Sequence, residues 1–171
     1  MACTQTLSGL TKDCSPSMGG IVEVLIANSA DVTSVTANNG IIDTITMAAS
    51  AKFKKYEFAR NTGSLSSNYA IAPENGTRYV QSDLVLVFNK METAKRVEIS
   101  ALAQSDLVCI VKDANGKYWY LGKDEPVMAS AGDGLTGTAR ADRNGYSITL
   151  QDNSAEMPYE VDESIIGGLV A

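Results

Sequence analysis

Hydrophobic and polar residues alternate along much of this chain with the two-residue period that is typical of β-strands. Ile21–Ala27 is apolar almost throughout, which indicates a largely buried strand. Arg78–Phe88 is the longest candidate, and Gln81 and Asp83 make one side of its first half polar. Further strands are predicted at Ile41–Met47 and at Ala51–Arg60, where Phe53 falls on one face and Tyr56 and Phe58 on the other.

Four Asn-Gly pairs divide the sequence into strand-length pieces, at residues 39–40, 75–76, 115–116 and 144–145. This dipeptide readily adopts the positive φ angles of tight hairpin turns. We therefore predict one hairpin from Leu107–Lys112 and Lys117–Leu121. A second is predicted from Thr136–Ala141 and Tyr146–Gln151, with its turn at residues 144–145.

One segment has a helical period instead. Between Lys90 and Gln104, apolar residues recur every three to four positions: Met91, Ala94, Val97, Ala101 and Leu102. The pattern predicts an amphipathic helix at about 90–104 with Asn89 as its N-cap. The expected fold class is α+β and mostly β: an antiparallel β-sandwich or barrel-like domain with one flanking helix and long assembly loops.

Two segments lack clear periodicity, 61–76 and 124–134, and both are expected to be long loops. Long loops in a compact domain often have a task, such as reaching a neighbouring subunit, although simple mobility is an equal alternative. The N-terminal segment 1–17 and the C-terminal segment 154–171 are candidate intersubunit arms, or else frayed ends. We expect residues 1–171 to form a single domain of this kind.

The composition agrees with a folded, acidic protein. Of the 171 residues, 44% are hydrophobic and 20% are charged, and the net charge is −6. A broad basic patch for nucleic-acid phosphates is therefore disfavoured. Residues 1–17 do not have the pattern of a signal peptide, and no run is apolar enough for a bilayer span, so no membrane partner is expected. Cys3, Cys14 and Cys109 are expected to be reduced, with a Cys3–Cys14 pair as the alternative after export.

The sequence contains no histidine. This excludes Ser-His and Cys-His nucleophilic systems and zinc sites that use imidazole. No phosphate-cradling glycine loop is present. Carboxylates are available for acid–base chemistry, but nothing fixes their spacing: Asp106, Asp113, Asp124, Glu125, Asp133 and Asp142. We predict no catalytic, cofactor-binding or metal-binding residue, and no enzyme activity.

Two features invite a binding role. Asp113 and Asp142 each precede an Asn-Gly pair and superficially resemble calcium loops, but they lack the remaining ligands, and turn formation explains them better. Trp119 could be a stacking platform for a base or a sugar ring. We expect it to pack in the core instead, with Tyr118 and Tyr120 on the opposite side of the strand.

The order of elements resembles that of the tail tube proteins of long-tailed bacteriophages and related contractile machines. The resemblance spans most of the chain and contains no short diagnostic motif. It rests on an N-terminal strand at Gly19–Val24, a long strand that ends in Leu84–Phe88, a helix, and paired hairpins that contain Val111–Trp119 and Thr136–Ala139.

The resemblance implies a virion structural protein, assembled in the host cytoplasm, whose hexameric rings stack into a tube. Subunit sheets would join into a barrel that lines a channel, the helix would lie outside it, and loop 61–76 and segment 1–17 would contact the next ring. Other tail proteins would be partners, and DNA would pass an acidic or polar lumen without specific binding. The polar alternation of Arg78–Asp83 and Thr136–Asp142 fits a sheet that is wet on its channel side.

Three other functions remain open on the sequence. One is another small virion protein, such as a head-decoration, head–tail connector or fibre-base protein. Another is a β-sandwich ligand-binding module built around Trp119. The last is a hydrolase that uses two carboxylates.

Overall fold

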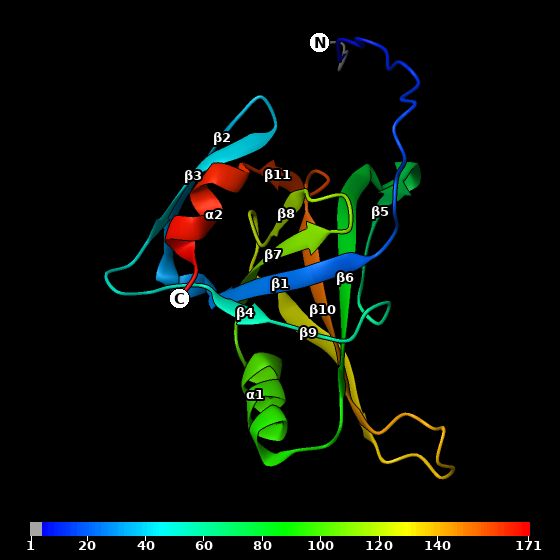
Figure 1. Ribbon diagram of the computed structural model, residues 1–171. Helices are drawn as coiled ribbons and strands as arrows, with labels where there is room; N and C mark the ends of the chain where they lie inside the picture. Colours follow the sequence, from blue (N-terminus) through cyan, green and yellow to red (C-terminus); the bar gives the residue numbers. More distant parts are fainter. Residues whose placement is uncertain (1–4) are drawn as a thin grey trace.

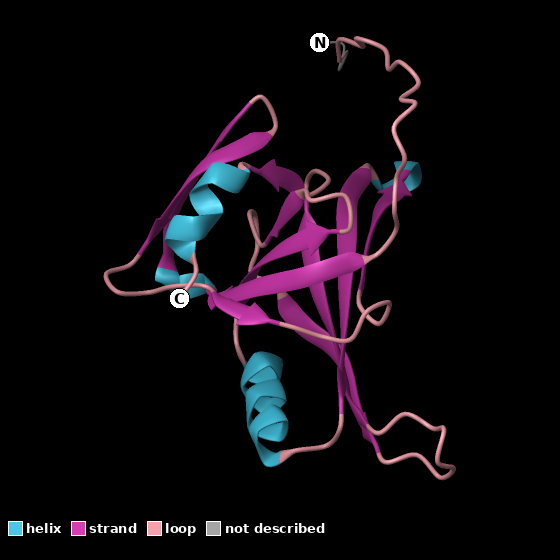
Figure 2. Cartoon of the chain, in the orientation of Figure 1, coloured by secondary structure: helices cyan, strands magenta, loops and turns pink. Residues whose placement is uncertain are grey.

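The computed structural model describes residues 5–171 and consists of two β-sheets with two α-helices (Figures 1 and 2). Strands make up 49% of the chain and helical residues 15%, so the α+β, mostly-β sandwich class is confirmed. The strands are β1 Ile21–Asn28, β2 Val32–Asn38, β3 Ile41–Met47, β4 Lys54–Tyr56, β5 Ser64–Ala72, β6 Thr77–Asn89, β7 Leu107–Asp113, β8 Tyr118–Leu121, β9 Met128–Leu135, β10 Gly145–Ser154 and β11 Tyr159–Val161. The helices are α1 Thr93–Gln104 and α2 Glu163–Leu169, and short 3₁₀ turns lie at Ser29–Asp31 and Pro73–Asn75.

Sheet A has seven strands in the order β2-β3-β11-β8-β7-β1-β4. Its neighbours are antiparallel except for β11 and β3, which pair in parallel. β1 and β7 lie inside the sheet and are apolar on both sides, because each face of sheet A packs against a separate core. The largely buried strand predicted at Ile21–Ala27 is therefore confirmed as β1.

Sheet C has four antiparallel strands in the order β5-β6-β10-β9. Its central pair is long, and every second residue of β6 from Val80 to Leu86 is buried. Leu84 and Leu86 pack against sheet A and form the first core, with Val24, Ile26, Leu102, Leu107, Cys109, Val111, Leu121, Val127, Ile148 and Leu150. Sheet C therefore buries one face only.

The helices cover different parts of the sandwich (Figure 1). α1 closes one end of the first core, where Leu102 is buried and Ile99 packs against it. α2 lies on the opposite face of sheet A and buries Ile166 and Leu169 in the second core, together with Phe53. The Asp162 carboxylate caps α2 by accepting a hydrogen bond from the Ser164 N–H at 2.8 Å.

The best-matched prediction is the hairpin around Asn115-Gly116, which β7 and β8 form as expected. Asp113 sets its turn, because Oδ1 accepts hydrogen bonds from the N–H groups of Asn115 and Lys117 at 2.8 and 2.9 Å. The helix predicted at about 90–104 is also present, but it begins later. Its N-cap is Glu92, and Asn89 ends β6 instead.

Several predicted loops and arms are wrong. Segment 61–76 contains β5, which pairs with β6 along its whole length. Segment 124–134 contains most of β9, which pairs with β10. Segment 154–171 is not an arm, because β11 joins sheet A and α2 completes the second core. Edge strands with one wet face need few apolar residues, so their signal in the sequence is weak.

The second predicted hairpin exists with a shifted partner. Residues 136–141 are loop, not strand, and the incoming strand is β9. The alternation read in Thr136–Asp142 therefore belongs to no sheet face. At Ala51–Arg60 only Lys54–Tyr56 is strand, as the short edge β4 of sheet A.

Candidate assembly surface

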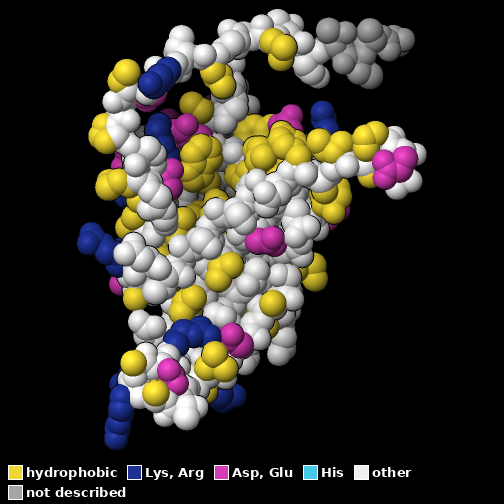
Figure 3. Space-filling view, turned by 90° about the vertical axis from the view of Figure 1, so that its right-hand side faces the viewer, with side chains coloured by type: hydrophobic (Ala, Val, Ile, Leu, Met, Phe, Trp, Pro, Cys, Tyr) yellow, Lys and Arg dark blue, Asp and Glu magenta, His cyan; other side chains and the backbone are white. Residues whose placement is uncertain are grey.

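The face of sheet C that points away from sheet A is uncovered and polar. Strand register places directly opposite residues on one side, for example Ser66, Asp83 and Gln151 across β5, β6 and β10. We call this the polar face and define it by the outward residues Ser64, Ser66, Asn68, Gln81, Asp83, Val85, Val87, Ser147, Thr149, Gln151 and Asn153. The same side continues into Ala70 and Tyr79 near the hairpin and into Met128, Ala131 and Asp133 on β9. Figure 3 looks toward this side of the molecule, where most side chains are neither apolar nor charged.

Cations are missing from the polar face. Within the described strands, its outward side chains include the carboxylate of Asp83 and no lysine or arginine. The Asp133 carboxylate lies beside it on β9 and pairs with Arg143 at 2.7 Å. That ion pair lowers the pKa of Asp133. The face therefore offers hydroxyl and amide groups, with a small excess of negative charge.

Both edges of sheet C are free. β5 pairs only with β6, and β9 pairs only with β10, so neither outer edge is paired with another strand of the described chain. Helix α1 packs beside β9 but forms no ladder with it. Edge strands present unpaired main-chain N–H and C=O groups, which are ready to pair with another strand. Sheet C can thus be extended on both sides by copies of itself.

The β5–β6 hairpin extends beyond the end of β10, because Ser154 is the last β10 residue in register and pairs with Val80. Tyr69 lies level with that point and is 51% exposed, and Ile71 lies past it and is 61% exposed. A hollow of about 580 Å³ beside Tyr69 is lined by Gln5, Gly40, Tyr69, Arg78 and residues 155–159. We call this region the hairpin end of sheet C; Figure 3 shows apolar side chains gathered at its upper right.

At the other end of sheet C, residues 136–144 connect β9 to β10 and project from the body (Figure 1). The loop is held by its own hydrogen bonds. The Asp142 carboxylate accepts from the N–H groups of Thr138 and Ala139 at 2.8 and 2.7 Å, which lowers the Asp142 pKa. Gly137 has φ +71°, and a Cβ there would lie 2.5 Å from that of Asp142. Asp142 is therefore a turn residue, as predicted.

Residues 5–19 form neither helix nor strand, and their side chains are exposed, including Leu7 and Leu10. Near its end the segment is tied to the body by the Met18 N–H, which donates to Asn115 Oδ1 at 2.8 Å. At its start, Gln5 lines the hollow at the hairpin end. Its predicted contact with a neighbouring ring stays a prediction. Cys14 is exposed and forms no disulfide with another described residue, and Cys3 lies outside the described residues, so their pairing stays open.

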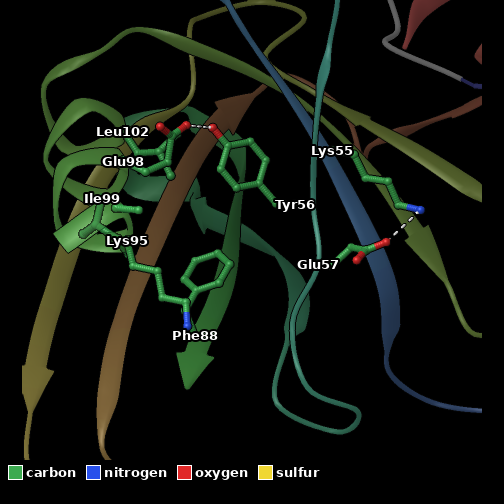
Figure 4. A pocket seen from close by; sticks show the side chains of 9 residues that line it. Lys55, Tyr56, Glu57, Phe88, Lys95, Glu98, Ile99 and Leu102 are labelled. Carbon is green, nitrogen blue, oxygen red and sulfur yellow. Dashed lines mark hydrogen bonds and ion pairs between the residues drawn. The ribbon is translucent and has the colours of Figure 1, made fainter. Parts of the chain in front are cut away.

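A separate hollow of about 330 Å³ lies between α1, residues 55–57 and the end of β6 (Figure 4). Phe88, Ile99 and Leu102 give it an apolar floor. The Tyr56 hydroxyl donates to the Glu98 carboxylate across its opening, and burial together with Glu98 raises the Tyr56 pKa. Lys55 points away and pairs with Glu57 and Glu23, each at 3.1 Å. The hollow thus contains one tyrosine–carboxylate pair and no nucleophile or free base.

Trp119 is half-buried, and its indole N–H donates to Asp113 Oδ2 at 2.9 Å. It belongs to neither buried core, so the prediction that it packs in the core is only partly confirmed. The tyrosines on either side, Tyr118 and Tyr120, lie on the other side of the strand, as predicted, and are buried in the second core. The Trp119 indole N–H is thus engaged within the hairpin, and a ligand-binding role for the half-exposed ring stays a hypothesis.

One carboxylate is buried, and sequence reasoning did not single it out. Asp152 is 2% exposed on the inward side of β10. Its carboxylate accepts hydrogen bonds from the Gly122 N–H at 3.2 Å and the Ser154 hydroxyl at 2.6 Å. Burial raises the Asp152 pKa, against the effect of these bonds. Burial also raises the pKa of Cys109, so this thiol stays protonated.

The six carboxylates considered from the sequence do not form one site. Asp113 and Asp142 hold turns, Asp133 pairs with Arg143, and Asp124 accepts a hydrogen bond from the Ala155 N–H at 2.8 Å. Within residues 5–171, no three His, Cys, Asp or Glu residues are placed to hold a metal ion. Neither helix in that range is long and apolar enough to cross a membrane.

Comparisons with protein-family models, curated proteins and solved structures give no match. The functional argument therefore rests on the chain's own features. Foremost among them is sheet C, with its polar face and two free edges.

Proposed function

We propose that this chain is a virion structural protein, a tail tube subunit whose copies form rings that stack into a tube. The observation that carries the proposal is sheet C, whose uncovered polar face lies between two unpaired edge strands. Joining β9 of one copy to β5 of the next would pair both edges and continue the sheet around a ring. Six copies per ring is the number that the family resemblance implies.

The polar face has the chemistry that a DNA channel requires. Proteins hold DNA phosphates with Lys and Arg, and the outward residues of the described polar face include neither. Asp83 adds negative charge, which repels phosphate. A channel lined by this face would give passing DNA no strong binding site, so the DNA would slide through without specific contacts.

Sheet A supplies the wall behind such a channel. It packs on the inner face of sheet C through the first core, and α2 covers part of its far side. Under this proposal the partners are other copies and other tail proteins, and the protein resides in the virion after assembly in the host cytoplasm.

Electron microscopy of the purified wild-type protein tests the proposal. We expect rings with a central hole, and tubes at higher concentration. A monomer whose molar mass by light scattering does not change with concentration would contradict it.

The sharper test blocks one edge of sheet C. Ser130 lies on edge strand β9 and is exposed, and Ser34 is its match on β2, the edge of sheet A. Lysine on an edge strand discourages strand addition. We expect S130K to remain monomeric and S34K to form rings as the wild type does. Equal ring formation by both variants would refute the edge-to-edge contact, provided thermal unfolding shows both folded.

A further inference from the structure

The two ends of sheet C differ in charge. The loop end contains residues 136–144, and the hairpin end lies at the opposite end of the same strands, since β10 pairs Gly145 with Asn89 at one end and Ser154 with Val80 at the other. A contact between the loop end of one copy and the hairpin end of another would therefore run along the strands. It would be perpendicular to the edge-to-edge contact of the proposed ring.

The loop end has a free cation. Its carboxylates are already engaged: Glu92 pairs with Lys90 at 2.7 Å, Asp133 with Arg143 at 2.7 Å, and Asp142 with backbone N–H groups. Arg140 is exposed at the tip of the loop and makes no ion pair with any described residue. Figure 3 shows basic side chains gathered at this lower end.

The hairpin end has an excess of carboxylates. Its carboxylates Glu74, Asp124, Glu125 and Glu156 outnumber its cations Arg78 and Lys123. Asp124 accepts a hydrogen bond from the Ala155 N–H, and Glu156 accepts one from the Tyr159 hydroxyl. Lys123 lies over the Tyr159 ring, 4.3 Å from its centroid. Glu74 is exposed in the turn at the hairpin tip and forms no ion pair with any described residue.

Shape and preorganisation agree with the charges. The loop tip is preorganised, because the hydrogen bonds that the Asp142 carboxylate accepts from Thr138 and Ala139 already hold the backbone next to Arg140. Small side chains flank Arg140 on both sides, at Ala139 and Ala141. A fixed loop loses little entropy when it docks. The hairpin end offers the hollow beside Glu156, which Tyr69 lines, and Ile71 adds exposed apolar surface farther along β5.

We infer that the β9–β10 loop of one copy docks at the hairpin end of a second copy, with Arg140 facing Glu74 and Glu156. The contact is heterologous, because it joins two different surfaces. A copy that is bound through its loop still has a free hairpin end, so the contact can repeat from one ring to the next. This inference rests on the proposed function, for which it supplies the surface that joins successive rings. It also names the occupant of the apolar hairpin end.

Charge reversal tests the contact. R140E leaves both edges of sheet C unchanged, so we expect it to form rings but to lose stacked rings in electron micrographs. The control is K54E, which makes the same charge change at an exposed position on β4, at the edge of sheet A. K54E should stack as the wild type does. E74R should also lose stacking, and the double variant R140E/E74R should regain it.

These outcomes separate the two proposals. R140E that stacks like K54E, or a double variant that does not recover stacking, overturns the head-to-tail contact while rings still support the tube. Wild-type filaments one subunit wide that R140E disperses would support the contact and contradict the ring.

Discussion

At the scale of single residues, the most informative side chain is the buried carboxylate of Asp152. It connects two elements, because it lies on β10 and accepts a hydrogen bond from the Gly122 N–H just after β8. The acidic side chains Asp124 and Glu125 add repulsion from the same segment. Burial and this repulsion raise its pKa, so the folded state holds the proton more tightly than the unfolded state does.

The sign of the pH effect follows from this shift. Stability from a raised pKa is fully present below the pKa of the unfolded chain and is lost as the pH rises through the folded pKa. Asp152→Asn keeps an oxygen for Gly122 and removes the charge, so its free energy of unfolding should exceed that of the wild type at pH 7. The excess should shrink toward pH 4. Denaturant unfolding across this pH range measures it.

Asp152→Ala is the matched comparison. It removes the acceptor and leaves the buried N–H of Gly122 unpaired, so we expect a loss of about 1–3 kcal/mol in the free energy of unfolding. If the Asn variant has the same pH profile as the wild type, the carboxylate does not carry the buried charge inferred here.

At the scale of elements, the sequence predicted best what the core dictates. β1 and β7 contain dense apolar residues because both faces of sheet A are buried, and β6 alternates because sheet C buries one face. Helix α1 keeps a helical period because only one side packs. β5 and β9 are missed as strands because many of their positions are serine, asparagine, alanine or glycine. Such positions are fixed by pairing with a neighbour, which a local pattern does not encode.

The same reasoning explains the misread C-terminus. Ile165, Ile166 and Leu169 have a helical spacing, but two glycines interrupt it at 167–168. Contacts with the second core stabilise the helix in spite of these glycines. The Phe53 N–H donates to the Leu169 carbonyl at 2.9 Å, and the side chains of both residues are buried. The polar residues Gln81 and Asp83 predict that one face of the long strand is exposed to water. That sheet C has two unpaired edges can be seen only in the folded topology.

Leu169→Ala distinguishes a packed helix from an arm. Removing a buried leucine side chain from the second core should lower the free energy of unfolding by about 2–5 kcal/mol. Ser164→Ala, at an exposed position of the same helix, should change it by about 0.5 kcal/mol or less. Urea denaturation of both variants gives the comparison. Equal stability of the two would mean that α2 does not contribute to the core.

At the scale of the whole molecule, the two proposed contacts differ in their physical basis. Edge pairing of sheet C uses main-chain hydrogen bonds, which dissolved salt screens little. The head-to-tail contact relies on exposed charges, with Arg140 on one side and Glu74 on the other, and these are screened once the Debye length falls below their separation. One protein would thus form a ring and a stack by forces that respond differently to salt.

Ionic strength should therefore take the assembly apart in a fixed order. The Debye length falls from about 10 Å at about 0.1 M salt to about 3 Å at about 1 M, so sodium chloride should separate stacks into rings before any ring opens. Chloride is the appropriate anion, because sulfate also strengthens the burial of apolar surface. Sulfate would therefore stabilise the stacks through the exposed side chains of Tyr69 and Ile71 while it screens the charges. Sedimentation velocity follows both species, and K54E should show the wild-type response because Lys54 lies at neither end of sheet C. Two results would contradict this order: rings that open before the stacks separate, or stacks that persist at about 1 M salt. Either would mean that charge does not hold the head-to-tail contact, or that hydrogen bonding does not hold the edge-to-edge contact.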